Sequence, residues 1–148
     1  MTLSAEDRTA ITELIHMHGH LFDSGALDRL DELFTPDVVY DVTGLGAGSL
    51  QGLAALRDAT RALGAANPVG HHVTNIVLTE VTDHQVRALS KGIGVKADGS
   101  CGSVTYEDTI DRGDQGWRIS HRSVLAPGAP LNARWRAPSG EEGARGGR

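Results

Sequence analysis

Residues 71–96 read HHVTNIVLTEV, TDH and QVRALSKGIGVK, two extended runs separated by a three-residue turn. Two more extended runs follow, at residues 102–112 and 117–125. The connecting segments hold Asp, Gly and Ser, which tolerate the dihedral angles of tight turns. Consecutive strands joined by tight turns predict an antiparallel meander, and the other elements are expected to pack around it.

The residues before the meander have helical periodicity instead. Ser4 and Asp7 form a variant of a capping box, after which apolar residues recur at helical spacing. A second, short amphipathic segment is expected to end near Pro36, because the residue before a proline disfavours helix. The predicted elements are helices at residues 5–22, 27–34 and 53–63 and a short strand at 38–42. Helices first and strands later predict an α+β fold.

The second run of the meander also predicts a pocket. The small or polar residues of one parity are Ala88, Ser90, Gly92 and Gly94. A strongly curved, mostly antiparallel sheet with helices packed against it then encloses a cone-shaped cavity. The apolar residues of the other parity are Leu89, Ile93 and Val95. Because these would otherwise be exposed, we expect a homo-oligomer, either a dimer or a trimer.

Length and composition fit one globular domain. The chain has 148 residues, too few for two independent cores. Its 39% apolar and 22% charged residues exclude wholesale disorder. We place the domain at residues 1–126. Residues 127–148 hold Pro, Gly, Arg and Glu without periodicity, and are predicted to form an arm or a disordered tail.

Charge and cysteine content exclude several classes of partner. The net charge is −5 and most basic residues are scattered, which argues against nucleic-acid binding. Neither a secretory signal nor a membrane-length apolar run is visible, so we expect a cytoplasmic protein without a membrane partner. Cys101 is the only cysteine, which excludes an intramolecular disulfide and a thiolate metal cluster. No glycine motif for phosphate binding is present.

His18 is the most informative single residue. It occupies the apolar face of the first predicted helix, where an aliphatic residue is usual. Either a buried, hydrogen-bonded histidine or a pocket-lining group fits that position. We include it among the candidate substrate-binding residues, together with Phe22 on the same helix and Tyr40 on the short strand. His16 and His20 are four residues apart but read as surface residues without a third ligand, so we expect no metal site.

Two pairs of adjacent polar residues lie on predicted strands. His71 and His72 begin the first run, so the alternation of side chains sends one into the concavity and the other outward. Glu107 and Asp108 are adjacent in the third run, and one of them also points inward. Asp23 ends the first helix within Asp-Ser-Gly, where it is either a turn residue or a site carboxylate.

Arg122 and Asp41 are further candidates. Arg122 has the opposite parity from Trp117 and Ile119 on the last run. Either it enters the pocket while those two residues pack on the outer face, or a bulge intervenes, or it is a solvated charge. Asp41 lies on the short strand just before a glycine-rich loop and could be a rim carboxylate or a general base.

Three segments together resemble the NTF2-like, SnoaL-like superfamily over about residues 5–126. They are FDSGALDRLDELFTPDVVYD at residues 22–41, GHHVTNIVL at 70–78 and YEDTIDRGDQGWRISHR at 106–122. The superfamily has cone-shaped α+β folds and includes scytalone dehydratase, hexachlorocyclohexane dehydrochlorinase, ketosteroid isomerase and polyketide cyclases, along with members that have no activity. The resemblance implies the fold more strongly than the function.

The resemblance also implies roles for individual residues. Asp23 and His71 match the dyad of the dehydratase and dehydrochlorinase members, and Arg122 matches the dehydrochlorinase's pocket arginine. His18 stands where that enzyme has a lysine, which departs from the pattern. Asp41 matches the position of the isomerase's general base, but the oxyanion-hole tyrosine of that enzyme's first helix is absent.

The implied activity is that of a cofactor-independent lyase or isomerase, most similar to a dehydratase, acting on a small hydrophobic cyclic substrate. Asp23 would orient His71, which removes a proton, while Arg122 or His18 stabilises the departing group or oxyanion. Neither a metal nor another cofactor is expected. One alternative is a cyclase or epoxide-opening enzyme led by Asp41 or Glu107, and another is a ligand-binding domain without activity. The candidate substrate-binding residues are His18, Phe22, Tyr40, Asp41, His72 and Glu107.

Overall fold

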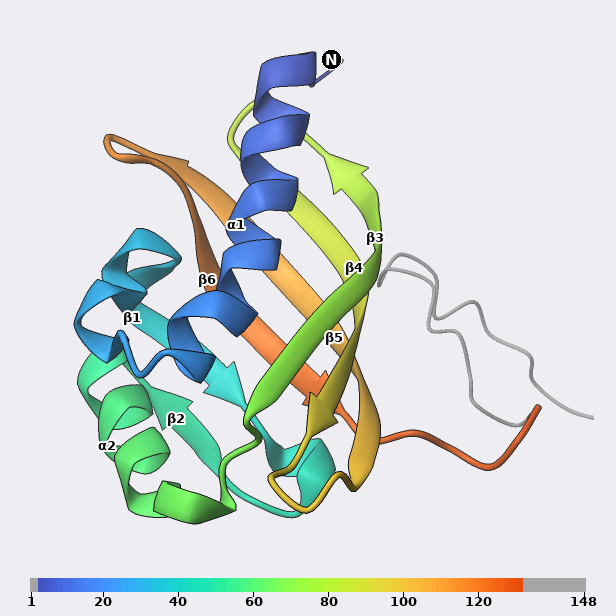
Figure 1. The fold of residues 1–148 in the computed structure, drawn as a ribbon. Helices are drawn as coiled ribbons and strands as arrows, with labels where there is room; N and C mark the ends of the chain where they lie inside the picture. The colour runs from blue at the N-terminus through green and yellow to red at the C-terminus, as the bar shows by residue number, and fades with distance from the viewer. Residues whose placement is uncertain (1–2, 132–148) are drawn as a thin grey trace, which may run out of the picture.

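The structure is a computed structural model that describes residues 3–131 (Figure 1). One six-stranded sheet, in the order β2-β1-β6-β5-β4-β3, curves around helix α1 (Ala5–Asp23) (Figure 1). Its strands are β1 (Phe34–Asp41), β2 (Ser49–Gln51), β3 (Gly70–Val81), β4 (Gln85–Val95), β5 (Cys101–Gly113) and β6 (Gly116–Leu125). Every neighbouring pair is antiparallel except β1 and β6, which are parallel. The predicted α+β fold with a mostly antiparallel, curved sheet is confirmed.

The four strands of the predicted meander occur at the predicted places, each bound within one residue of the expected one. Strands β4 and β5 pair in continuous register from Gln85 opposite Asp111 to Val95 opposite Cys101. On β4, Ala88, Ser90 and Gly92 face inward and are buried. Other side chains cover these three residues, and Gly94 is the one of the four predicted small residues that lines the cavity described below.

Helix α1 begins with the predicted cap. The Ser4 hydroxyl accepts a hydrogen bond from the backbone N–H of Asp7 at 3.0 Å. The buried face of the helix consists of Ile11, Leu14, Ile15, His18, Gly19 and Leu21. This face packs mainly against β3, so the apolar stripe is removed from water by the sheet.

The segment from residue 27 to residue 51 differs from the prediction. Its first element is the 3₁₀ helix η1 (Leu27–Glu32), and β1 already begins at Phe34, so Pro36 lies inside a strand and does not end a helix. The pairing of β1 with β6 is irregular between Phe34 and Val39, so the missing N–H of Pro36 costs no ladder hydrogen bond there. Strand β2 was not predicted, because three residues are too few to give an alternation pattern.

The remaining elements of the described chain are helical. They are η2 (Thr43–Leu45), α2 (Leu53–Leu63) and η3 (Gly64–Ala66). Helix α2 has the predicted bounds and packs against β1 and β2. No helix within residues 3–131 is long and apolar enough to cross a bilayer. Most of the predicted C-terminal arm, residues 132–148, lies outside the described residues.

A bulge on β6 resolves the parity of Arg122. Ile119 pairs with Ile110 and His121 pairs with Thr109, so Ser120 is an extra residue without a partner on β5. The alternation of side chains therefore shifts by one residue at Ser120. As a result Ile119 and Arg122, which are three residues apart, both point inward and are fully buried. Of the three alternatives for Arg122, the bulge is correct.

Candidate active site

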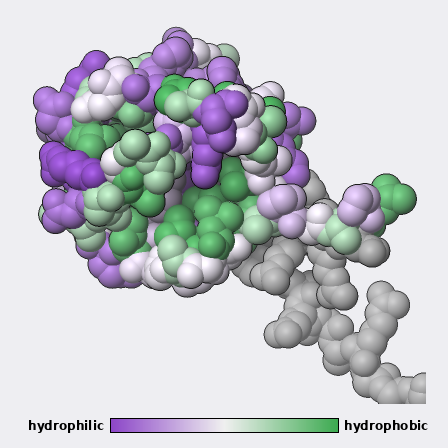
Figure 2. All heavy atoms as spheres, turned by 60° about the horizontal axis from the view of Figure 1, so that its bottom comes forward, coloured by the Kyte–Doolittle hydropathy of each residue, from purple (hydrophilic) through white to green (hydrophobic). Residues whose placement is uncertain are grey.

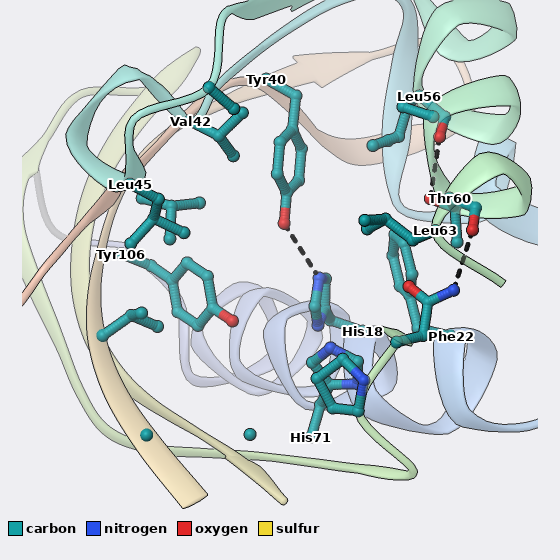
Figure 3. Close-up of a pocket in the computed structure, with 18 of the residues that line it drawn as sticks. His18, Phe22, Tyr40, Val42, Leu45, Leu56, Thr60, Leu63, His71 and Tyr106 are labelled. Carbon is teal, nitrogen blue, oxygen red and sulfur yellow. Dashed lines mark hydrogen bonds between the residues drawn. The ribbon is translucent and has the colours of Figure 1, made fainter. Parts of the chain in front are cut away.

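A cavity of about 910 Å³ opens between the concave face of the sheet, α1 and α2. Figure 2, in which the bottom of Figure 1 comes forward, shows apolar side chains gathered around its open end. Apolar groups such as Leu50, Leu56 and Val124 form most of the wall. The polar groups of the wall include His18, Tyr40, His71 and Tyr106, and Figure 3 shows these four pointing toward one another. A mostly apolar cavity with a few converging polar groups is typical of a small-molecule site.

Asp23 and His71 form a close pair at this cavity, although they are 48 residues apart. The ring Nδ1 of His71 lies 2.6 Å from Oδ1 of Asp23, and the backbone N–H of His71 donates to both carboxylate oxygens at 3.1 and 2.9 Å. The side chain of His71 is 17% exposed and that of Asp23 is 27% exposed, so neither is surrounded by bulk solvent. A carboxylate accepts hydrogen bonds, so Nδ1 donates its proton to Asp23, and in a neutral imidazole the lone pair is then on Nε2.

Gly19 allows helix α1 to approach β3 closely enough for this pair to form. A Cβ atom added at Gly19 would lie 2.2 Å from the backbone carbonyl oxygen of His71, a distance that real Cβ atoms do not adopt. Asp23 is one helical turn beyond Gly19 on α1. The missing side chain of Gly19 therefore sets the distance between the two halves of the pair.

His18 lies beside the pair and is 1% exposed. Its Nε2 lies 3.3 Å from the hydroxyl of Tyr40, while its Nδ1 has no hydrogen-bond partner among the described residues. Burial, together with the charge of Arg122 and the neighbouring His71, holds the pKa of His18 well below its usual value. His18 is therefore neutral at pH 7, and its ring also packs against Phe22 at a centroid distance of 4.4 Å.

Tyr106 was not singled out in the sequence. It shares the inward parity of β5 with Asp108, which is the signal that could have found it. Its ring lies 5.7 Å from the ring of His18. A Cβ atom at Gly92 would lie 2.4 Å from a carbon of the Tyr106 ring and 2.9 Å from its hydroxyl oxygen. Gly92 thus leaves the space that the phenol end of Tyr106 occupies.

Arg122 lies beneath the two tyrosines and does not line the cavity. Tyr40, Arg122 and Asp108 are paired residues on β1, β6 and β5, so they form one row across the sheet. Two nitrogens of Arg122 donate to the two oxygens of Asp108, each at 2.7 Å, and both side chains are fully buried. The guanidinium carbon lies 4.3 Å from the centroid of the Tyr106 ring. Arg122 was expected to contact the substrate directly, and its position away from the cavity wall does not support that role.

Three predicted substrate-binding residues lie elsewhere. His72 is exposed, because the strand alternation turns it away from the cavity while His71 faces in. Asp41 does not line the cavity, and its carboxylate accepts hydrogen bonds from the backbone N–H and the hydroxyl of Thr43, which lower its pKa. Glu107 is on the outer face of β5, so Asp108 is the inward member of that pair.

No cluster of three or more His, Cys, Asp or Glu side chains that could hold a metal ion occurs within residues 3–131. His16 and His20 are exposed on α1, in agreement with their prediction as surface residues.

Comparison with known proteins relates the chain to one family. A family model described as the SnoaL-like domain matches residues 3–123. An NTF2-like protein with a cystatin-like fold from Novosphingobium aromaticivorans is 30% identical, with a TM-score of 0.70 and 86% of each chain covered. A protein from the same organism, provisionally named as an aromatic ring hydroxylase, is 25% identical, with a TM-score of 0.69, covering 84% of this chain and 92% of that chain.

A third structure from Novosphingobium aromaticivorans is provisionally named as a scytalone dehydratase. It is 19% identical, with a TM-score of 0.66, and covers 79% of this chain and 81% of that chain. At this identity the likeness shows the fold alone. No curated protein matches the sequence.

Proposed function

The chain belongs to the SnoaL-like domain family, and on this premise we propose that it is a cofactor-independent lyase or isomerase acting on a small hydrophobic cyclic substrate. The proposed reaction begins with the removal of a proton from carbon, and dehydration is the leading outcome. One observation carries the proposal: a carboxylate holds an imidazole by its Nδ1 on the wall of a mostly apolar cavity.

The general base of the proposed reaction is His71. Its Nε2 takes the proton from a substrate carbon that lies beside an activating group. Asp23 does not touch the substrate and acts as a positioning residue: it fixes the tautomer and the ring orientation of His71, and its charge stabilises the imidazolium that forms. In a dehydration, the imidazolium can return the proton to the departing hydroxyl group, which leaves as water.

The positions of the other carboxylates support this proposal over the carboxylate-led cyclase or epoxide-opening alternative. Asp41 is engaged by Thr43 outside the cavity wall, and Glu107 is on the outer face of β5. Asp108 faces inward but is fully buried and paired with Arg122. Asp23 differs from these carboxylates because it is hydrogen-bonded to His71, which lines the cavity and can accept a proton.

Deuterium exchange tests the proposal whatever the product of the reaction is. The protein is incubated in D₂O with a panel of hydroxylated alicyclic and aromatic compounds, and loss of C–H signals and formation of conjugated products are followed by NMR and absorbance. For any compound that reacts, we expect His71→Ala to reduce the rate by roughly 10²- to 10⁴-fold. Asp23→Asn is expected to reduce the rate as well. The amide of asparagine can donate a hydrogen bond to Nδ1 of His71, which favours the tautomer whose Nε2 carries the proton.

Two matched controls are available within the chain. His72→Ala removes the adjacent imidazole, which faces outward, and Asp41→Asn removes a carboxylate that is outside the cavity wall. Both variants are expected to react at the rate of the unmodified protein. Loss of turnover in Asp41→Asn with full activity in His71→Ala would support the carboxylate-led reaction instead. A protein that binds members of the panel but exchanges no proton would be a ligand-binding domain.

A further inference from the structure

Lys96 is the one Lys or Arg side chain among the described residues that line the cavity. The described lining holds no Asp and no Glu, although the whole chain carries 19 acidic against 14 basic residues. The wall of the cavity therefore has the opposite sign of charge from the protein as a whole. Because no carboxylate on this wall would repel an anion, the cavity favours a ligand with negative charge.

The strand alternation and the turn after β4 place Lys96 at the open end of the cavity. Lys96 follows the last residue of β4 and has the inward-facing parity of Gly92 and Gly94. Its backbone N–H donates to the carbonyl of Ser100 at 2.8 Å, and its own carbonyl accepts from the N–H of Gly99 at 2.9 Å. This turn lies at the bottom of Figure 1, the end that Figure 2 brings forward. The main chain of Lys96 is thus fixed at the mouth, while its side chain lines the cavity.

Lys96 makes no ion pair with any described residue. Asp98 is the nearest acidic residue in sequence, but it does not line the cavity, and its carboxylate accepts hydrogen bonds from the N–H and the hydroxyl of Ser100 at 2.9 and 2.6 Å. These hydrogen bonds are the main cause of the lowered pKa of Asp98, and the charge of Lys96 is a smaller one. Lys91, the other lysine of the chain, is on the outer face of β4 and donates to the hydroxyl of Thr105 at 3.1 Å. The ammonium group of Lys96 is therefore available to a ligand.

The pairing of β3 with β4 relates Lys96 to the proposed general base. Gly94 pairs with His71, and Lys96 is two residues farther along β4 toward the open end. Two residues of a strand span about 7 Å. Leu45 and Leu63 also line the cavity and are 50% and 58% exposed, so the rim around the lysine is apolar. A molecule that reaches both His71 and Lys96 needs apolar surface for most of its length and a negative charge at its outer end.

We propose that Lys96 binds a carboxylate of the substrate, which makes the substrate a cyclic acid. Its apolar rings occupy the cavity, with the reacting carbon at His71 and the carboxylate at the mouth. This inference rests on the proposed function and names its substrate class. Because the carboxylate is remote from the bond that breaks, Lys96 contacts it equally in the ground state and in the transition state. Lys96 is therefore a specificity-determining residue that takes no part in the chemical step.

A pair of fluorescent probes tests this site apart from turnover. 8-Anilinonaphthalene-1-sulfonate and N-phenyl-1-naphthylamine share one aromatic framework, but only the first is negatively charged. We expect Lys96→Met to weaken binding of the sulfonate probe by about two- to fivefold, as for exposed ion pairs, and to leave the neutral probe unchanged. Lys96→Glu is expected to weaken the sulfonate probe by about four- to twentyfold, because repulsion adds to the lost attraction. Added salt is expected to weaken the sulfonate probe more in the unmodified protein than in Lys96→Met.

Lys91→Met is the matched control. It removes the same charge from the same strand, but from the outer face of the sheet. Both probes are expected to bind to this variant as tightly as to the unmodified protein. Ala59→Trp locates the probes, because Ala59 is on α2 and lines the cavity, and the larger side chain is expected to weaken both of them. Circular dichroism and thermal unfolding establish that each variant is folded.

Turnover provides a second readout for any acid of the compound panel that exchanges a proton. Lys96→Met is expected to raise KM for the acid by about two- to fivefold and to leave kcat unchanged, since the lost contact is the same in the ground state and the transition state. For the methyl ester of the same acid, neither constant is expected to change. A fall in kcat for both compounds would assign Lys96 to the chemical step and contradict the inference.

The inference is overturned if the unmodified protein binds neither probe, if Lys96→Met weakens both probes equally or neither of them, or if Lys91→Met weakens the sulfonate probe as much. Probes that Ala59→Trp leaves unaffected bind outside the cavity, which also overturns it. If Lys96→Met selectively weakens the sulfonate probe but no compound exchanges a proton, the proposed function fails and the anion site stands. If His71→Ala abolishes exchange while Lys96→Met affects acid and ester alike, the proposed function stands and this inference fails.

Discussion

Arg122 and Asp108 are charged side chains that the fold buries completely. Removing two charges from water is costly, and the doubly hydrogen-bonded geometry offsets that cost only while both partners are present. The pair also supports the ring of Tyr106 through the guanidinium face. Its role in the proposed site is therefore indirect: it holds the aromatic side chains whose hydroxyl groups reach the cavity.

Replacement of one member of this pair is expected to be more harmful than replacement of both. Arg122→Met leaves the Asp108 carboxylate buried without a partner, and we expect a loss of about 3–5 kcal/mol in the free energy of unfolding. The double variant Arg122→Met, Asp108→Leu removes both charges and is expected to recover most of that loss. Urea unfolding followed by circular dichroism measures all three free energies. Equal losses in the single and the double variant would contradict this account of the pair.

At the scale of elements, the contact between α1 and β3 decides whether the proposed dyad can form. The helix ends at Asp23 and the strand begins at Gly70, so His71 lies where the strand first meets the helix. The N–H of His71 donates to the carboxylate of Asp23 there. The two elements are therefore joined at the same residues that make up the proposed site.

Gly19→Ala tests this contact. Alanine in place of glycine within a helix normally stabilises it by roughly 0.5–1 kcal/mol. Here the added Cβ would lie 2.2 Å from the His71 carbonyl oxygen, so the backbone of α1 or β3 must move. Overpacking of this kind costs roughly 1–3 kcal/mol, and we expect it to exceed the helical gain. NMR of the histidine ring nitrogens is expected to show loss of the Asp23-bonded Nδ1–H signal of His71.

Gly48→Ala is the control for this prediction. A Cβ atom at Gly48 meets no atom within 4 Å, although Gly48 also lines the cavity. We expect this variant to keep the His71 signal and the midpoint of unfolding. A Gly19→Ala protein with the same signal and higher stability would mean that α1 and β3 tolerate the added atom.

At the scale of the whole molecule, Asp7 connects the start of α1 with the end of β5 and the start of β6 through hydrogen bonds. Its carboxylate accepts hydrogen bonds from Ser4, from Nε1 of Trp117 at 2.9 Å and from Arg112 at 2.8 Å. The last two partners are 110 and 105 residues away in sequence. These hydrogen bonds, that from Trp117 most of all, lower the pKa of Asp7 to about 2.

This shift predicts part of the acid sensitivity of the protein. The pKa of Asp7 falls from 3.8 in the unfolded chain to about 2 in the folded one, so between these values the unfolded state binds more protons. The stabilisation is present above the unfolded pKa and is lost as the pH falls toward the folded one. Melting temperatures of the unmodified protein are expected to drop more between about pH 5 and about pH 2.5 than those of Asp7→Asn.

Asp37→Asn serves as the control, because Asp37 is exposed on β1 and its carboxylate makes no hydrogen bond with a described residue. It is expected to follow the unmodified protein over the same pH range. Identical pH dependence in Asp7→Asn and the unmodified protein would mean that the carboxylate does not contribute in this way.

The outer face of the sheet leads to a separate prediction at this scale. Val77 and Ile93 are 49% and 41% exposed there. Ile93 is on this face by the alternation of β4, and the register shift of β3 between Thr74 and Val77 places Val77 there, opposite Leu89. A dimer or trimer that covers this face remains a prediction. Sedimentation of the unmodified protein and of Ile93→Lys would test it.

Local sequence patterns were enough to predict the elements with strong periodicity. Helix α1, helix α2 and the four-strand meander follow from local alternation, turn residues and caps, because those signals act between near neighbours in the chain. They also placed small residues on the concave side of β4 and so predicted a cavity. Short elements such as η1 and β2 were missed, because a few residues carry too little pattern and the surrounding sheet decides their conformation.

Which polar residues share the cavity depends instead on contacts between elements that are far apart in the chain. Alternation states that one of His71 and His72 faces inward, but the pairing of β3 with α1 selects His71. The bulge at Ser120 turns Arg122 toward Asp108, and this ion pair is formed between strands that no local signal aligns. Tyr106 meets His18 and Tyr40 only because the curved sheet brings β5, α1 and β1 together. Side chains far apart in sequence acquire a common environment through packing, and packing depends on the whole chain.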